Sequence, residues 1–420
     1  MNLNRRSFLS WLAAGGAAAA VGPRLYGRAN ADEPVVGPFF LFVNASGGWD
    51  PTMLCDPKGR ASEAEADPIN HFDAADIEQV GAFKVAPIDG HVAFFERFKS
   101  DLLVLNGVDT QTNSHEIGSR FMWSGSIKPG FPSEAALVAA AREPRPALAF
   151  LSNGGYDVTD GLVAPTRIPD TSAILEIAYP DRLDKADDRT GVLPLDILAR
   201  LDQARTERLQ RQLDAATLPR LRHAMASLQI ARVGNNDLAR LSAKLPSALD
   251  TSGNPLKRQA QVAMACFAAG VSASATMEIG NFDTHGDHDR IHTQSMKDIV
   301  AGITFAMDEA ERQGIADKVV VIVGSDFGRT PYYNDTAGKD HWPITSMLLM
   351  GPGIRGGRVL GGTDGSFAPT LLDPTTLAPS SSGIRITPAH VHASLRALSG
   401  VATWEGAAPY GVGDALPLFT

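Results

Sequence analysis

Five short runs rich in apolar residues stand out along the chain, and the three clearest do not alternate with polar positions. Three are clear, at residues 39–43, 102–105 and 319–323, and two are weaker, at 275–279 and 346–350. Apolar runs of this length, bounded by glycine and polar residues, are typical of strands buried on both faces of a parallel sheet. The pattern therefore predicts an α/β fold with a central, mostly parallel sheet.

Helical periodicity fills the segments between these runs. One buried helix face is predicted from the spacing of Ile299, Ile303, Ala306 and Ala310, and Gly314 is placed to end that helix. Residues 193–243 are rich in Leu, Arg, Ala and Gln at helical period, so we expect a helical insertion there. A final helix is predicted to begin at Pro388, and residues 32–420 are expected to form a single domain.

Polar residues follow the apolar runs closely. In open parallel sheets, ligands bind just beyond the carboxyl ends of the strands, so residues at these positions are expected to share one site. We predict that six residues lie around one cleft at this edge of the sheet, namely Asp50, Ser114, Asp283, His285, Asp326 and His341.

The densest group of candidate metal ligands is the run DTHGDHD at residues 283–289, with His292 one helical turn further on. Asp and His side chains suit a divalent cation, and His288 and His292 would share one helix face. The alternative is an ordinary helix N-terminus, where the acids Asp287 and Asp289 interact favourably with the helix dipole.

Asp326 and Ser114 each allow more than one interpretation. An acid at the end of a buried strand is costly unless it is paired or metal-bound, so Asp326 is a ligand, the salt-bridge partner of Arg329 or a helix cap. For the three acids Asp50, Asp283 and Asp326 together, the alternative to a metal is partial neutralisation by Arg329 and Lys339. Ser114 precedes a predicted helix, where free backbone N–H groups stabilise an oxyanion or bind phosphate. The alternative is that Ser114 only caps that helix.

Composition excludes several classes of protein. With 38 Lys and Arg against 47 Asp and Glu, the net charge of −9 disfavours a nucleic-acid binder. A hydrophobic content of 44% allows a sizeable core, so extensive disorder is excluded. Two cysteines, Cys55 and Cys266, are too few for a disulfide scaffold. They either form one disulfide or stay separate as small apolar residues, and we favour the second interpretation.

The N-terminus carries a twin-arginine pattern at Arg5 and Arg6, followed by a short apolar stretch. Ala29-Asn30-Ala31 matches the small-x-small cleavage rule, so residues 1–31 are predicted to be a signal peptide. The apolar stretch is too short for the roughly 20 residues that a membrane-spanning helix needs. We therefore expect export through the twin-arginine machinery to the periplasm or beyond, without stable membrane insertion.

Several stretches resemble the motifs of one family. They are SDFGRTP at residues 325–331, Asn334, GKDHW at 338–342, FDTH at 282–285 and His115-Glu116. Together they are similar to the domain of unknown function 1501 family, and the order of acids, hydroxyl and histidines resembles the alkaline phosphatase-like superfamily. The chain departs from many members of that superfamily by having Asp326-Phe327 where they have Asp-His in tandem.

This resemblance implies a three-layer α/β sandwich and a set of functional residues. The metal ligands would be Asp50, Asp283, His285 or His288, Asp326 and His341, with Ser114 as the nucleophile and His115 beside it as a second catalytic residue. Mixed imidazole and carboxylate ligands suit zinc, manganese or iron better than calcium. We expect an exported, metal-assisted hydrolase of small-molecule or polymer phosphate or sulfate esters. The alternative is a non-catalytic exported protein that binds a ligand or partners another secreted factor.

Overall fold

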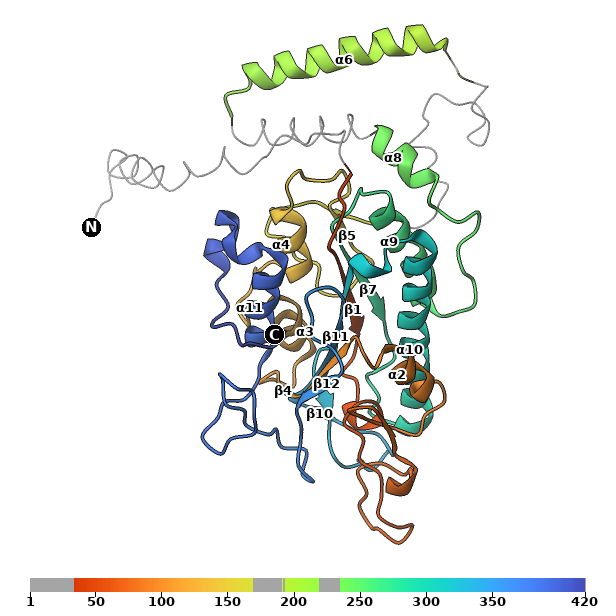
Figure 1. Ribbon diagram of the computed structural model, residues 1–420, viewed down its shortest axis with the longest axis vertical. Helices are drawn as coiled ribbons and strands as arrows, with labels where there is room; N and C mark the ends of the chain where they lie inside the picture. Colours follow the sequence, from red (N-terminus) through yellow and green to blue (C-terminus); the bar gives the residue numbers. More distant parts are fainter. Residues whose placement is uncertain (1–33, 169–190, 192, 219–234, 420) are drawn as a thin grey trace, which may run out of the picture.

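The computed structural model describes residues 34–168, 191, 193–218 and 235–419 (Figure 1). The predicted signal peptide, residues 1–31, lies outside the described residues, as does part of the predicted helical insertion.

An eight-stranded sheet forms the centre of the fold, in the order β12-β4-β11-β8-β1-β7-β5-β6. All five predicted strands are present in it, as β1 (Phe39–Ala45), β4 (Leu102–Asp109), β7 (Ser274–Ile279), β8 (Val319–Ser325) and β11 (Ile344–Met350). The three remaining strands lie toward the edges: β5 (Phe150–Leu151), β6 (Pro165–Thr166) and β12 (Arg358–Gly361). Outside this sheet, β2 (Glu78–Val80) pairs with β3 (Phe83–Val85), and β9 (Gly328–Arg329) pairs with β10 (His341–Trp342).

The strand directions confirm a mostly parallel sheet. Strand β1 runs parallel to both β7 and β8, whereas β11 runs antiparallel to β8 and β4. Strand β4 therefore points the same way as β8. Because β11 is reversed, it begins at the edge where its neighbours end.

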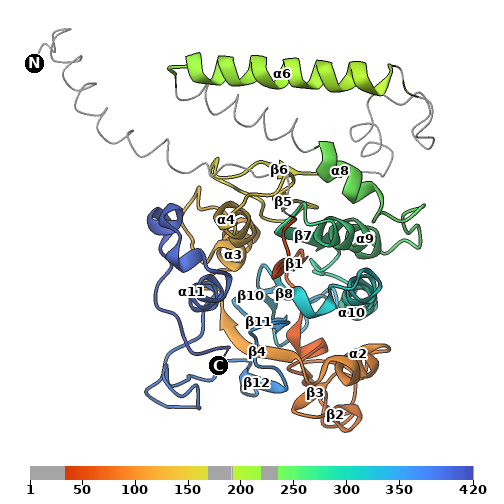
Figure 2. The same cartoon turned by 45° about the horizontal axis from the view of Figure 1, so that its top comes forward.

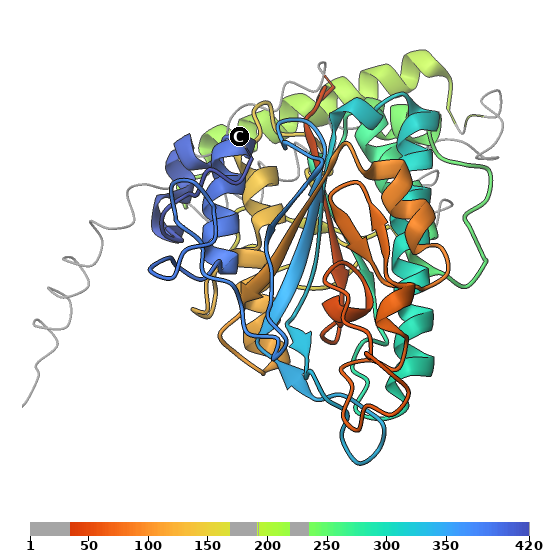
Figure 3. The ribbon, with the colours of Figure 1, turned by 60° about the horizontal axis from the view of Figure 1, so that its bottom comes forward.

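Helices cover both faces of the sheet, which gives the predicted three layers (Figures 2 and 3). One face carries α2 (His91–Phe98), α9 (Pro255–Ala268) and α10 (His288–Gln313), and the other carries α3 (His115–Ser124), α4 (Glu134–Ala141) and α11 (Pro388–Ser399). Successive residues of β1 point to opposite faces, so Phe39 and Leu41 pack in one core and Phe40 and Phe42 in the other.

The predicted helix ends are confirmed. Helix α10 buries the predicted apolar face, and Gly314 ends it in the left-handed conformation at φ 72°. Helix α11 begins at Pro388, after the N-cap residue Thr387. Helices α6 (Leu195–Ala215) and α8 (Asn235–Ser242) lie within the expected insertion, between β6 and β7.

Short 3₁₀ helices complete the described secondary structure: η2 (Pro51–Met53), η3 (Ala74–Asp76), η4 (Ala316–Lys318), η5 (Val401–Thr403) and η6 (Glu405–Tyr410). Both cysteines are buried and free, so Cys55 and Cys266 do not form a disulfide. Among the described helices, none has the length and apolar character needed to cross a bilayer.

Candidate metal centre

The carboxyl ends of the parallel strands bring polar residues from distant segments to one edge of the sheet. Asp326 directly follows β8, and Asp283 follows β7 by a short loop. His115 is the first residue of α3, which comes after β4. His341 opens β10, just before the reversed strand β11 begins at the same edge.

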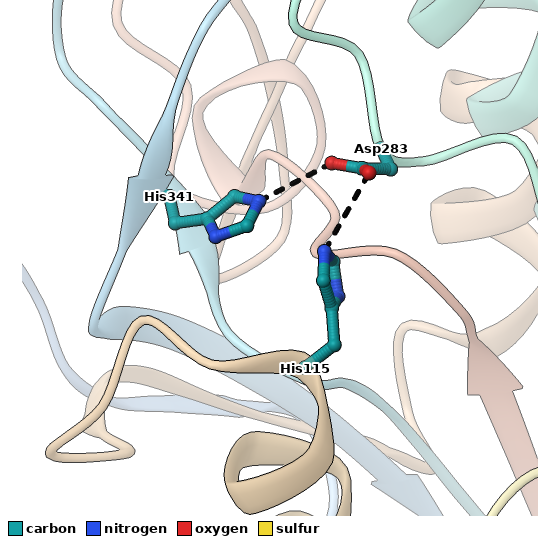
Figure 4. A group of neighbouring side chains, drawn as sticks. All are labelled: His115, Asp283 and His341. Atoms are coloured by element: carbon teal, nitrogen blue, oxygen red, sulfur yellow. Dashed lines mark hydrogen bonds and ion pairs between the residues drawn. The ribbon is translucent and has the colours of Figure 1, made fainter.

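Three of these side chains meet closely enough to hold a metal ion. One atom each of His115, Asp283 and His341 lies within 4.8 Å of the other two (Figure 4). His341 Nε2 is 3.3 Å from Asp283 Oδ1, and His115 Nε2 is 3.6 Å from Asp283 Oδ2. His285 approaches the same place, with its Nε2 2.9 Å from His341 Nε2 and 3.1 Å from Asp283 Oδ1. We refer to these four residues as the central group.

The three imidazole rings of the central group share one hydrogen-bonding arrangement. Each Nδ1 donates to an oxygen on the outer side: His115 to Asp326 Oδ2 (2.8 Å), His285 to Asp340 Oδ1 (2.6 Å) and His341 to the carbonyl of Asn113 (2.7 Å). Because these oxygens only accept, Nδ1 carries the hydrogen in each ring, and a neutral ring then presents the Nε2 lone pair inward. Outer acceptors of this kind orient metal-binding histidines in many proteins.

Arg329 compensates the charge of Asp283. Its Nη2 donates to Asp283 Oδ1 over 2.7 Å, and its remaining N–H groups donate to the backbone carbonyls of Gly47, Gly48 and Lys339. Partial burial acts to raise the pKa of Asp283, but the hydrogen bond and charge of Arg329 outweigh it and lower this pKa. The pairing of Arg329 with Asp326, considered from the sequence, is therefore replaced by a hydrogen-bonded pairing with Asp283.

The histidines differ in their electrostatic surroundings. The hydrogen bond to Asp326 raises the pKa of His115, whereas partial burial lowers the pKa of His341. Asp283 and His285 are exposed and the other two members are half-buried, so the central group opens to solvent. On the inner side, the Phe327 ring packs against His115 and His341, with centroids 4.7 and 4.4 Å away.

Two of the predicted ligands lie in a neighbouring buried network. Asp50 is completely buried, and its Oδ2 lies 2.6 Å from Lys339 Nζ and 3.3 Å from His288 Nε2. Neither Asp50 nor His288 belongs to the central group. The structure thus brings three predicted ligands together, Asp283, His285 and His341, and adds His115, which the resemblance placed among the catalytic residues.

Asp326 and Ser114 lie beside the central group. Asp326 is buried behind His115, where it acts on the ring through Nδ1. Ser114 is the exposed N-cap residue of α3, but its side chain does not cap the helix. Sequence reasoning missed the outer acceptors Asn113 and Asp340, although Asp340 directly precedes His341 in the GKDHW run and was visible as an acid beside a histidine.

Two sequence-family models match parts of the chain. Residues 40–377 match the model described as "Protein of unknown function (DUF1501)", so the chain belongs to the DUF1501 family. Residues 2–22 match the twin-arginine translocation pathway signal sequence, which supports the predicted export. A comparison with curated protein sequences gives no significant match.

Solved structures that this chain resembles include a sulfatase, an alkaline phosphatase and a phosphonate monoester hydrolase. A 2-O GAG sulfatase shares 10% identity over 91% of this chain and 76% of its own, with a TM-score of 0.36. TAB5 alkaline phosphatase shares 10% sequence identity over 76% of this chain and 93% of its own, with a TM-score of 0.32. A phosphonate monoester hydrolase from Silicibacter pomeroyi shares 11% sequence identity over 88% of this chain and 73% of its own, with a TM-score of 0.31. At these scores, no residue or activity is carried over from them.

Proposed function

We propose that this protein is an exported, metal-dependent hydrolase of phosphate or sulfate esters that acts in the periplasm or outside the cell. The observation that supports the proposal is that the Nε2 atoms of His115, His285 and His341 each lie 3.1–3.6 Å from an oxygen of the Asp283 carboxylate, while each Nδ1 is hydrogen-bonded on the other side of its ring. Within the described part of the chain, Arg329 supplies the only guanidinium that donates to this carboxylate.

The donor set fits a divalent cation. Two neutral rings whose Nδ1 atoms carry the hydrogens cannot both accept at the 2.9 Å that separates His285 Nε2 from His341 Nε2, so a proton or a cation must lie between them. Three imidazoles and one carboxylate are ligands that zinc, manganese and iron accept. Such an ion would polarise the ester and lower the pKa of a bound water to about 7.

The chain's own residues position this chemistry. Asp326, Asp340 and the Asn113 carbonyl fix the imidazoles, and Arg329 fixes the carboxylate. Ser114 remains our candidate nucleophile because it is exposed, adjoins His115 and stands at the N-terminus of α3, where backbone N–H groups favour an anionic ester. The substrate would be a small molecule or a polymer that reaches the open side of the central group.

One observation favours the alternative of a non-catalytic binding protein. No hydrogen bond joins the Ser114 hydroxyl to an imidazole or carboxylate anywhere in the described residues, so no general base is in place for it. In that case the central group would bind a metal or an anionic ligand without turning it over.

Ester hydrolysis by the mature protein separates the two candidates. We would assay a panel of phosphate and sulfate esters with zinc, manganese or iron, using wild type, His341→Ala and His390→Ala. The His390 side chain lies at the start of α11 and, within the described part of the chain, hydrogen-bonds only to Thr387, so it serves as the matched histidine control. We expect His341→Ala to reduce metal-stimulated hydrolysis by about two orders of magnitude and His390→Ala to leave it intact. Metal binding without hydrolysis of any ester would favour the binding protein.

A further inference from the structure

Behind the central group lies a completely buried ion pair. The Asp50 carboxylate accepts from the Thr52 backbone N–H (2.9 Å) and hydroxyl (2.5 Å) through Oδ1, and from Lys339 Nζ (2.6 Å) through Oδ2. Lys339 Nζ also donates to Asn70 Oδ1 over 2.8 Å and lies 5.1 Å from the Tyr333 ring centroid. A carboxylate, an amide oxygen and an aromatic face thus surround one ammonium group.

An imidazole faces the same pair. His288 is completely buried, its Nδ1 is 2.6 Å from Thr284 Oγ1, and its Nε2 is 3.3 Å from Asp50 Oδ2. This Nε2 forms no hydrogen bond to any described residue. His292 stacks on His288, with centroids 4.3 Å apart, and accepts the Asp50 backbone N–H. His288 Nε2 therefore faces the same carboxylate oxygen that accepts from the Lys339 ammonium.

We propose that the Lys339 ammonium is a permanent internal cation that occupies a latent second metal site, so that this site binds a divalent ion only when Lys339 is removed. The ammonium donates to Asp50 Oδ2 and Asn70 Oδ1, and His288 Nε2 lies 3.3 Å from the same Asp50 oxygen. Carboxylate, amide oxygen and imidazole together suit a divalent transition metal. A buried carboxylate needs a compensating cation, and here the chain supplies it.

The backbone joins this site to the central group. Lys339 N–H donates to the carbonyl of Thr284, which lies between Asp283 and His285, and the Lys339 carbonyl accepts from Arg329. The two sites are therefore adjacent, and Lys339 and Arg329 each neutralise one acid, Asp50 and Asp283 respectively. The inference deepens the proposed function. It rests on that function in one respect only: in the wild type, the single bound ion would be the one at the central group.

The test counts manganese and zinc ions in the full mature protein. Wild type should bind at most one ion, and Lys339→Ala should bind one more than wild type. Lys339→Met is the matched control, because it removes the charge but fills the space. We expect both variants to melt at a lower temperature than wild type without metal, and added metal to restore the melting temperature of Lys339→Ala alone. Asp50→Asn in the Lys339→Ala background should abolish the additional ion.

The outcomes are distinguishable from failure of the proposed function. If wild type binds no ion and Lys339→Ala binds one, the result supports Lys339 as the internal cation and contradicts a metal ion at the central group. Two ions in wild type would overturn the proposal, as would an equal count in wild type and Lys339→Ala, or an additional ion that persists in the double variant. His288→Ala keeps the Asp50–Lys339 pair and should leave the wild-type count unchanged; a lower count would also overturn it.

Discussion

Single residues that accept from the imidazole Nδ1 atoms determine which ring nitrogens of the central group carry hydrogen and how the rings are oriented. Asp326 holds the Nδ1 hydrogen of His115 and raises the pKa of that ring. Asp326→Asn should therefore lower the His115 pKa in metal-free protein and weaken zinc binding by about 10- to 100-fold. A proton NMR titration and calorimetry would measure the two effects. Asp340→Asn is the control, since it touches His285 and should leave the His115 pKa alone; an unchanged His115 pKa in Asp326→Asn would contradict the assignment.

His91 should make the stability of the fold depend on pH. It is completely buried at the start of α2, and burial lowers its pKa from 6.5 to about 4. Between these values the unfolded chain binds the proton more readily, so this contribution to stability is present above about pH 6.5 and is lost as pH falls toward 4. The total loss is about 3 kcal/mol.

Denaturant unfolding at pH 7 and pH 5 would measure this loss. We expect His91→Leu, which has a similar volume and does not titrate, to lose about 2 kcal/mol less than wild type between the two pH values. Equal pH dependence in both proteins would show that His91 is not the group responsible.

The residues of the site were only partly predictable from the sequence. Asp283, His285 and His341 were recognised because acids and histidines shortly after a buried strand, or in a loop before one, lie at the sheet edge where ligands bind. Neutralisation of the acids by Lys339 and Arg329 was an alternative from the sequence, but which acid each would pair with was not predictable, because Asp50 and Asp326 follow strands as Asp283 does. Only the three-dimensional positions of Lys339 and His115 show that one acid pairs with an ammonium and the other lies behind a ring.

Among the elements, the strands were the most predictable. The apolar runs mark β1, β4, β8 and β11, because strands covered on both faces are mostly apolar, and β7 was the weaker prediction because Thr276 and Glu278 interrupt its run. The run itself does not encode direction, so the reversal of β11 was not predicted. That reversal follows from the loop between β8 and β11, which turns the chain back at one edge and thereby places His341 there.

The loop after β1 must pass very close to the loop that carries Asp283. Gly47 has φ 115°, and a Cβ there would lie 2.6 Å from the Asp283 backbone nitrogen. We expect Gly47→Ala to lower the free energy of unfolding by about 3 kcal/mol, from backbone strain and overpacking together, and to weaken metal binding.

Gly130→Ala provides the control for Gly47→Ala. Gly130 also has a positive φ, 82°, but no atom lies within 4 Å of its added Cβ. Gly130→Ala should lower the free energy of unfolding only by the backbone strain, about 1–2 kcal/mol, and should leave metal binding unchanged. Equal effects of the two substitutions on stability and metal affinity would contradict the close approach.

For the whole molecule, the twin-arginine signal sequence supports export, and the described fold is α/β. Replacing Arg5 and Arg6 by lysine should leave the precursor in the cytoplasm, since the twin-arginine pair is the feature that this export route reads. Cell fractionation with an antibody would check it, with the mature protein expected to begin at Asp32. Normal amounts of processed variant outside the cytoplasm would refute the twin-arginine route.

X-ray absorption spectroscopy of the zinc-loaded mature protein tests the central claim most directly. His115, Asp283 and His341 form one group, and His285 Nε2 lies 3.1 Å from Asp283 Oδ1. The spectrum should therefore show three imidazole nitrogens and an oxygen at about 2.0–2.2 Å. His285→Ala should reduce the imidazole count to two. A first shell made of oxygen alone, or one that His285→Ala and His341→Ala both leave unchanged, would contradict a metal site at the central group.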